Sequence, residues 1–167
     1  MHRPDLSKPR FLFDAQAIPF SARLTSPVAA EIDPAGATVC SPVGGLVCNR
    51  AENISYKGVI SVGAAYSQIS AAWHPEEKEF NTVVLSVVER VNILNIFTID
   101  RAVAAMTVKR SGVLDGGKAI NSLNLIDYTG SYFEGIRVAG KEVRVQLRPD
   151  VYGEKGSGIL LKDSAGR

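Results

Sequence analysis

Apolar and polar residues alternate over residues 136–147, near the end of the patterned part of the chain. Because successive side chains of a strand point to opposite faces, this period of two is typical of a strand with one buried face. The run is interrupted by Ala139-Gly140-Lys141, and glycine readily adopts the positive φ of a tight turn. The pattern therefore predicts a β-hairpin whose turn lies at Gly140-Lys141.

A second alternating run covers residues 54–69. It is longer than a typical strand, so we expect one long strand with a bend or a bulge near Gly58 or Gly63. One face of that strand would carry the larger apolar residues, namely Ile54, Tyr56, Ile60, Val62, Ala64 and Tyr66.

Residues 80–97 are apolar on both faces and rich in β-branched side chains, which fit a pleated sheet better than a helix. Residues 83–94 also match helical spacing, so periodicity alone leaves both interpretations open. The β-branching favours a strand. Alternation continues over residues 95–110 and predicts the next strand.

The two ends of the chain differ in composition from its middle. Residues 1–10 combine two prolines with basic residues, and residues 150–167 are rich in Gly, Lys and Ser. Neither end is expected to pack as a regular element. Residues 11–24 fit an edge strand, where a proline is tolerated, and residues 25–45 fit a long surface connection with short extended pieces. We therefore predict a single β domain over residues 11–149, flanked by an N-terminal arm and a C-terminal tail.

These patterns indicate an all-β fold: an antiparallel β-sandwich or flattened barrel of about eight to ten strands with extended N- and C-terminal arms. Composition agrees with a folded domain, since 46% of residues are hydrophobic and 22% are charged. The net charge of +2 does not favour a nucleic-acid partner. The sequence shows neither the apolar core of a signal peptide nor a membrane span. We expect a cytoplasmic protein, with export by a dedicated route left open.

No motif for a cofactor or a metal ion is found. Cys40 and Cys48 could close a disulfide, but in the expected compartment two reduced thiols are favoured. Neither cysteine lies at zinc-ligand spacing from a histidine or from the other cysteine. The glycine-rich residues 153–158 lack the Gly-Lys-Ser/Thr ending of a phosphate-binding loop. We therefore expect no cofactor and no metal site.

Catalysis would require scattered groups to converge in one pocket. The candidates are Asp100, Glu89, His74 and the two cysteines, and no spacing in the sequence demands that they meet. His74 is expected in a solvated loop. In the pairs Asp100-Arg101 and Glu89-Arg90, neighbours on a strand point to opposite faces, so they are not expected to pair with each other. Either one charge is buried and paired elsewhere, or the strand has one solvated face. The sequence predicts a protein that is not an enzyme.

Two blocks of the chain carry a resemblance. They are Val91-Asn-Ile-Leu-Asn-Ile-Phe-Thr-Ile-Asp-Arg-Ala-Val-Ala-Ala105 and Gly130-Ser-Tyr-Phe-Glu-Gly-Ile-Arg-Val-Ala-Gly140. With residues 24–28 and 41–45, they resemble a group of uncharacterised bacterial all-β proteins with the pattern L-N-V-L-x-x-V-T-A-D-R and G-S-x-F-x-N-L-R-V-A-G. A looser resemblance extends to bacterial choice-of-anchor β proteins. The chain departs from the pattern at Ile99 and Gly135. The resemblance implies an all-β domain and brings no activity or site residues.

The composition of the ends suggests a function in self-assembly. Free termini of this kind gain order by adding to the open sheet edge of a neighbouring copy. We therefore predict a structural subunit that forms a homo-oligomer or filament through arm or strand exchange, as a ring or an open chain. The apolar contacts of this exchange would be Phe11, Leu12, Phe13, Ile159, Leu160 and Leu161. The alternative is a module that binds a small molecule or a carbohydrate through Tyr66 or Trp73.

Overall fold

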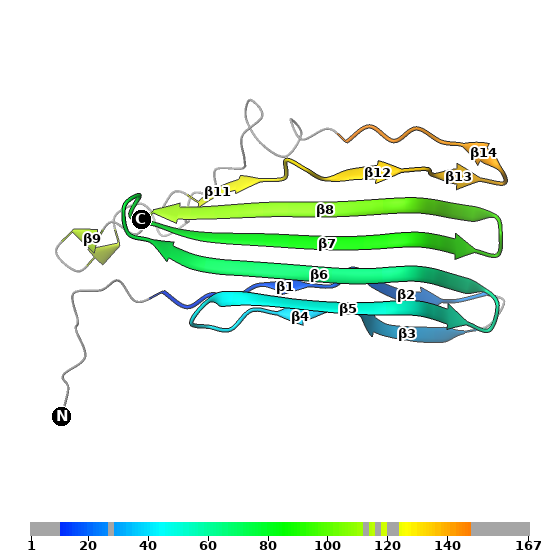
Figure 1. Cartoon of the computed structure of the whole chain (residues 1–167), viewed down its shortest axis with the longest axis horizontal. Helices are drawn as coiled ribbons and strands as arrows, with labels where there is room; N and C mark the ends of the chain where they lie inside the picture. The colour runs from blue at the N-terminus through cyan, green and yellow to red at the C-terminus, as the bar shows by residue number, and fades with distance from the viewer. Residues whose placement is uncertain (1–10, 27–28, 112–113, 116–117, 120–123, 148–167) are drawn as a thin grey trace.

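The protein is built from β-strands (Figure 1). The computed structural model describes residues 11–26, 29–111, 114–115, 118–119 and 124–147, and these residues contain no helix. No helix able to cross a membrane is therefore present in that part of the chain. The described strands are β1 Gln16–Ala17, β2 Phe20–Leu24, β3 Ala30–Ala35, β4 Thr38–Val39, β5 Gly45–Tyr56, β6 Ile60–His74, β7 Glu79–Ile93, β8 Phe97–Ser111, β9 Leu114–Asp115, β10 Lys118–Ala119, β11 Asn124–Asp127, β12 Tyr132–Glu134, β13 Arg137–Val138 and β14 Lys141–Glu142.

One large antiparallel sheet forms the main layer. Its strand order is β14-β13-β8-β7-β6-β5, and β11 and β12 also pair with β8. The long strands β5 to β8 form a meander, and at two of its turns a pair of neighbouring residues adopts positive φ. The β5–β6 turn contains Lys57 and Gly58, and the β7–β8 turn contains Leu94 and Asn95. The described part of the sheet does not close, so the flattened-barrel alternative is wrong and the antiparallel all-β prediction is confirmed.

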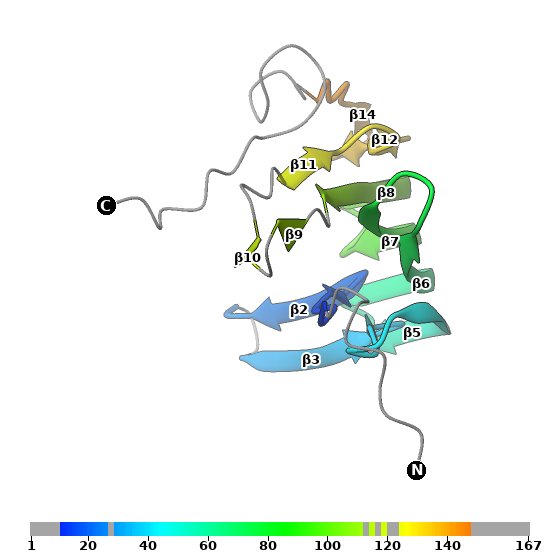
Figure 2. The ribbon, with the colours of Figure 1, turned by 90° about the vertical axis from the view of Figure 1, so that its left-hand side faces the viewer.

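A second, smaller layer covers one face of the large sheet. It consists of the pairs β1–β4 and β2–β3. Backbone hydrogen bonds from Phe13 to Pro42 and from Cys40 to Ala15 extend this pairing into a long two-stranded ribbon. Figure 2 shows the ribbon lying on one side of β5 and β6. We call this side of the large sheet the covered face and the opposite side the open face.

The ribbon approaches β6 closely because glycine lies at the contact. Gly36 has a φ of +67°, and a Cβ atom at this position would overlap the carbonyl group of Ala65. The buried Ser67 hydroxyl donates to the Gly36 carbonyl oxygen at 2.5 Å, and the Thr38 and Ser67 hydroxyl oxygens lie 2.8 Å apart. A short chain of hydroxyl groups therefore fixes the ribbon on the sheet.

The buried residues form two clusters under the ribbon. The first contains Phe13, Ala17, Cys40, Ile69, Ala71, Phe80 and Val84, and the second contains Ile60, Val62 and Val91. The second also packs against β2 and β3 through partly buried Phe20, Ala22, Leu24 and Ile32. On β6, the first cluster uses odd-numbered residues and the second uses even-numbered residues. The side-chain alternation of the sheet must therefore change phase between the clusters.

The phase changes at one row of residues, Asn53, Gly63, Arg90 and Asp100. In each ladder from β5 to β8 the pairing skips this row, passing for example from Val62↔Val91 to Ala64↔Glu89. Asn53 and Arg90 have φ values of 54° and 53°, a conformation that does not preserve the alternation of a strand. We call this row the phase-shift row. It allows both halves of the sheet to turn their apolar side toward the ribbon.

Several predicted elements are confirmed. The predicted hairpin forms between β13 and β14, but its turn is Ala139-Gly140 rather than Gly140-Lys141, with φ values of 48° at Ala139 and 77° at Gly140. Residues 83–94 are extended rather than helical. The predicted irregularity near Gly63 falls in the phase-shift row.

One predicted element is wrong. Residues 54–69 are not one strand, because the turn at Lys57-Gly58 separates β5 from β6. Residues 25–45 contain short extended pieces as predicted, and these pieces, β3 and β4, pair with the preceding segment. The predicted arms, residues 1–10 and 150–167, lie outside the described residues.

Candidate functional site

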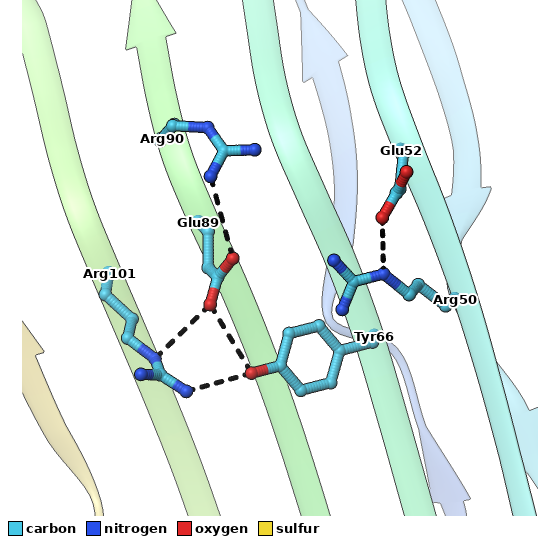
Figure 3. A network of polar contacts seen from close by, with 6 residues as sticks. All are labelled: Arg50, Glu52, Tyr66, Glu89, Arg90 and Arg101. Atoms are coloured by element: carbon cyan, nitrogen blue, oxygen red, sulfur yellow. Dashed lines mark hydrogen bonds and ion pairs between the residues drawn. The ribbon is translucent and has the colours of Figure 1, made fainter.

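Charged and aromatic side chains gather on the open face of the sheet. Figure 3 shows the network in front of the long strands, with the ribbon behind them. Cross-strand register brings these residues together, since Arg50 lies opposite Tyr66, and Glu89 lies opposite Arg101. The network comprises Arg50, Glu52, Tyr66, Glu89, Arg90 and Arg101.

Glu89 and Arg101 form the centre of this network. The Glu89 carboxylate lies 3.6 Å from Nε of Arg101 and 3.9 Å from Nη1 of Arg90, and its side chain is 22% exposed. Arg101 Nη2 donates a hydrogen bond to the Tyr66 hydroxyl oxygen at 2.9 Å. This bond is the main reason why the pKa of Arg101 is raised above its ordinary value. Arg101 therefore stays cationic and links β6, β7 and β8.

Arg50 extends the network to β5. Its guanidinium lies 5.0 Å from the centre of the Tyr66 ring, a cation–π geometry. Its Nε donates to Glu52 Oε1 at 2.6 Å, and this bond raises the pKa of Arg50 above its ordinary value. The Arg50 guanidinium is therefore held both by an aromatic ring and by a carboxylate.

The network links neighbouring strands through paired charges. Its carboxylates are paired with guanidinium groups, and it contains no histidine or thiol to act as base or nucleophile. Within the described residues, no group of three His, Cys, Asp or Glu side chains is arranged to hold a metal ion.

The scattered candidates for catalysis are not brought together. His74 is exposed at the far end of β6, about ten residue rows or about 33 Å from Glu89 along the strands. Asp100 pairs with Arg137 at 3.3 Å. Cys40 is buried, Cys48 is exposed, and both are free thiols. The expected pairing of Asp100 and Arg101 with residues other than each other is confirmed.

The expectation for Glu89-Arg90 is wrong, because these neighbours do form an ion pair. The positive φ of Arg90 breaks the alternation that would send the two side chains to opposite faces. The Arg90 guanidinium also lies against Gly63, where a Cβ atom would overlap it. The phase-shift row thus changes side-chain pairing as well as packing.

The two aromatic residues predicted to bind a ligand lie on opposite faces. Tyr66 belongs to the network on the open face. Trp73 packs against the first core cluster on the covered face, with its ring centre 4.5 Å from that of Phe80. The structure therefore does not combine them in one site.

The predicted assembly contacts have different locations. Phe11 stacks on Phe80 at 4.5 Å between ring centres, and Phe13 is part of the same core cluster. Leu12 points outward and is 76% exposed. Residues 159–161 lie outside the described residues, so their part in assembly stays a prediction.

One edge of the large sheet is β5. In the described chain, β5 pairs with β6 and has no strand paired on its other side, although β4 lies against it. The apolar side chains Val39, Val43 and Leu46, which lie on or near β5, are 63–86% exposed. We call β5 together with these residues the β5 edge.

The opposite edge consists of β12, β13, β14 and the following residues 143–147. Every residue of β12 to β14 is exposed. Residues 143–147 hold a backbone bond from Val143 to the Ile136 carbonyl at 2.8 Å but form no ladder with other described residues. We call this region the 132–147 edge. Its exposed apolar side chains, each 40–46% accessible, are Tyr132, Phe133, Val138, Val143, Val145 and Leu147.

Sequence reasoning missed both the open-face network and the β5 edge. Tyr66 and Arg101 lie 35 positions apart, and the register that joins them is set by tertiary pairing. The break near Gly63 was a usable signal, because a change of phase there moves the charged residues of the long strands to one face.

Comparison with known proteins identifies one family. Residues 11–165 match DUF8256, which is described as a domain of unknown function. No curated protein and no solved structure matches the chain. The resemblance to choice-of-anchor proteins stays a prediction.

Proposed function

The chain belongs to the DUF8256 family, and we propose that it is a non-enzymatic structural subunit that associates with its own copies by pairing strands at sheet edges. The observation that carries this proposal is the pair of open edges at the two ends of the large sheet. Each edge combines extended backbone with exposed apolar side chains.

An open edge favours pairing for a clear physical reason. Its outward N–H and C=O groups are a template for another strand, and natural monomers protect such edges with lysine, proline or a covering segment. The described β5 strand is 12 residues long, contains neither lysine nor proline, and carries charged side chains only at Arg50 and Glu52, which pair with each other. Exposed apolar side chains at the same edge add hydrophobic burial to the backbone bonds of a paired strand.

The open-face network supports a structural role. It joins β6, β7 and β8 through ion pairs and hydrogen bonds, and β5 through the cation–π contact of Arg50 with Tyr66, so it holds the sheet in register at its middle. A rigid sheet presents its edges in a fixed geometry, which is what strand pairing between copies requires.

A ligand-binding function is the second candidate. The observation that favours it is the position of the Tyr66 hydroxyl between Arg101 and Glu89 on the open face. A glycan array and a thermal-shift screen test it, and a hit that disappears in Tyr66→Phe would favour binding over assembly.

The proposed assembly is tested by light scattering after size-exclusion chromatography, with electron microscopy, over a range of protein concentrations. The wild-type chain is expected to form species larger than a monomer. Cys48→Lys places a charge on the edge strand and is expected to weaken association. Gln68→Lys is the matched control, since Gln68 pairs with Cys48 one strand further inside the sheet and is also exposed.

A truncation to residues 11–147 removes both arms and keeps both edges, so it tests which of the two carries association. If the edges carry association, this truncation assembles as well as the intact chain; if the arms carry it, the truncation is monomeric. A wild-type chain that remains monomeric at high concentration would exclude the proposed function.

A further inference from the structure

The two open edges are suited to each other. We infer that copies associate head to tail, with residues 143–147 of one copy pairing antiparallel to β5 of the next, so that the large sheet continues from subunit to subunit. This inference rests on the proposed function and names the surfaces that it uses.

The directions of the two edge strands allow them to pair. Five antiparallel steps lead from β5 through β6, β7, β8 and β13 to β14, so β5 and β14 run in opposite directions. Residues 143–147 continue the chain from β14. A second copy moved sideways in the plane of the sheet, without rotation, therefore places its β5 antiparallel to this segment.

The apolar sides of the two edges also lie on the same side of the sheet. Val138 lies opposite Phe97, on the covered side of the sheet. The backbone bond from Val143 to Ile136 continues the β13–β14 pairing, so alternation places Val143, Val145 and Leu147 on that same side. Sideways translation keeps the covered sides of the two copies together. The apolar side of the segment then meets the apolar side of β5, which includes Val47.

Both edges expose apolar side chains that pairing would bury. At the β5 edge, Val39 and Val43 are exposed next to the strand, and at the 132–147 edge Val143, Val145 and Leu147 are exposed. The exposed apolar side chains of each edge, which no described residue covers, would thus be covered by those of the other edge.

The symmetry of the contact decides whether assembly stops at a dimer or continues. A head-to-tail contact uses two different surfaces, so every added copy leaves one edge of each kind free, and growth continues unless a ring closes. A two-fold contact of β5 with β5 would use one surface twice and stop at a dimer. The two arrangements place different residues next to Cys48.

The experiment uses cross-linking between two full-length proteins. The first is the wild type, which supplies the exposed Cys48 thiol. The second carries Cys48→Ser and Gln146→Cys, because alternation places Gln146 on the open side of its segment, as it does Cys48 on β5. A control protein carries Cys48→Ser and Leu94→Cys, because Leu94 is also exposed but lies in the β7–β8 turn. Mixtures are treated with a short thiol cross-linker and the linked peptides are identified by mass spectrometry.

We expect links between Cys48 and the thiol introduced at position 146, at a yield at least several-fold above that of the position 94 control. Assembled protein that gives Cys48–Cys48 links and no links to position 146 would overturn the head-to-tail arrangement while leaving self-association intact. A wild type that shows no association by light scattering would overturn both proposals. Equal yields at positions 146 and 94 in assembled protein would also contradict the inference.

Discussion

Replacement of Gly36 by alanine tests how the ribbon is held on the large sheet. Gly36 and Gly58 have nearly the same backbone conformation, with φ values of +67° and +69°. They differ in surroundings, since a Cβ at Gly58 would meet nothing within 4 Å, whereas a Cβ at Gly36 would overlap the Ala65 carbonyl. Gly58→Ala is therefore a matched control for the cost of a positive φ alone.

The expected magnitudes follow from these differences. A positive φ costs a non-glycine residue about 1–2 kcal/mol, and both variants incur this cost. Gly36→Ala must also move the ribbon away from β6, which breaks the buried bond between the Ser67 hydroxyl and the Gly36 carbonyl. Loss of a buried hydrogen-bond partner costs about 1–3 kcal/mol. We therefore expect Gly36→Ala to be less stable than Gly58→Ala by about 1–3 kcal/mol.

Urea unfolding followed by circular dichroism measures this difference at low protein concentration, where association does not contribute. A thermal melt is the second readout, and for a chain of this size about 1 kcal/mol shifts Tm by about 2–4 °C. Equal destabilisation by the two variants would refute the account of the ribbon contact. So would a Gly36→Ala protein that is as stable as the wild type.

Three further predictions concern single side chains. Arg90→Gly is expected to be more stable than Arg90→Ala by about 1 kcal/mol in urea unfolding, because glycine accepts the positive φ at this position. Tyr66→Phe removes the acceptor of the Arg101 bond and is expected to lower the unfolding free energy by about 1 kcal/mol, measured in the same way. Hydrogen bonds from Thr129 lower the pKa of Asp127, so this group stabilises the fold above its unfolded pKa, and the stability is lost as pH falls through the folded pKa. Asp127→Asn is expected to reduce the loss of stability in acid titrations below about pH 4.

The local features of the fold could be predicted from the sequence. The hairpin turn at Ala139-Gly140 follows from a glycine inside an alternating run, and the strand over residues 83–94 follows from β-branching. Both signals act within a few residues of the chain, so no tertiary information is needed. The error over residues 54–69 has the same origin, because alternation resumes with the same parity after the turn at Lys57-Gly58 and hides it.

The candidate surfaces could not be predicted in the same way. Glu89 meets Arg101 because their strands are in register, and Arg90 meets Glu89 because a positive φ breaks the alternation. Neither condition is visible in a local pattern. An open edge is also a property of the whole sheet, since β5 is an edge only because no other described strand pairs with its outer side.

Hydrogen exchange of the β5 amides at increasing protein concentration tests the central claim most directly. If copies pair at this edge, exchange within residues 45–56 slows as association proceeds, because outward amides acquire partners. Exchange within residues 79–93 stays constant, because β7 is already paired on both sides. Exchange in residues 45–56 that is unchanged at concentrations where light scattering shows association would contradict the account.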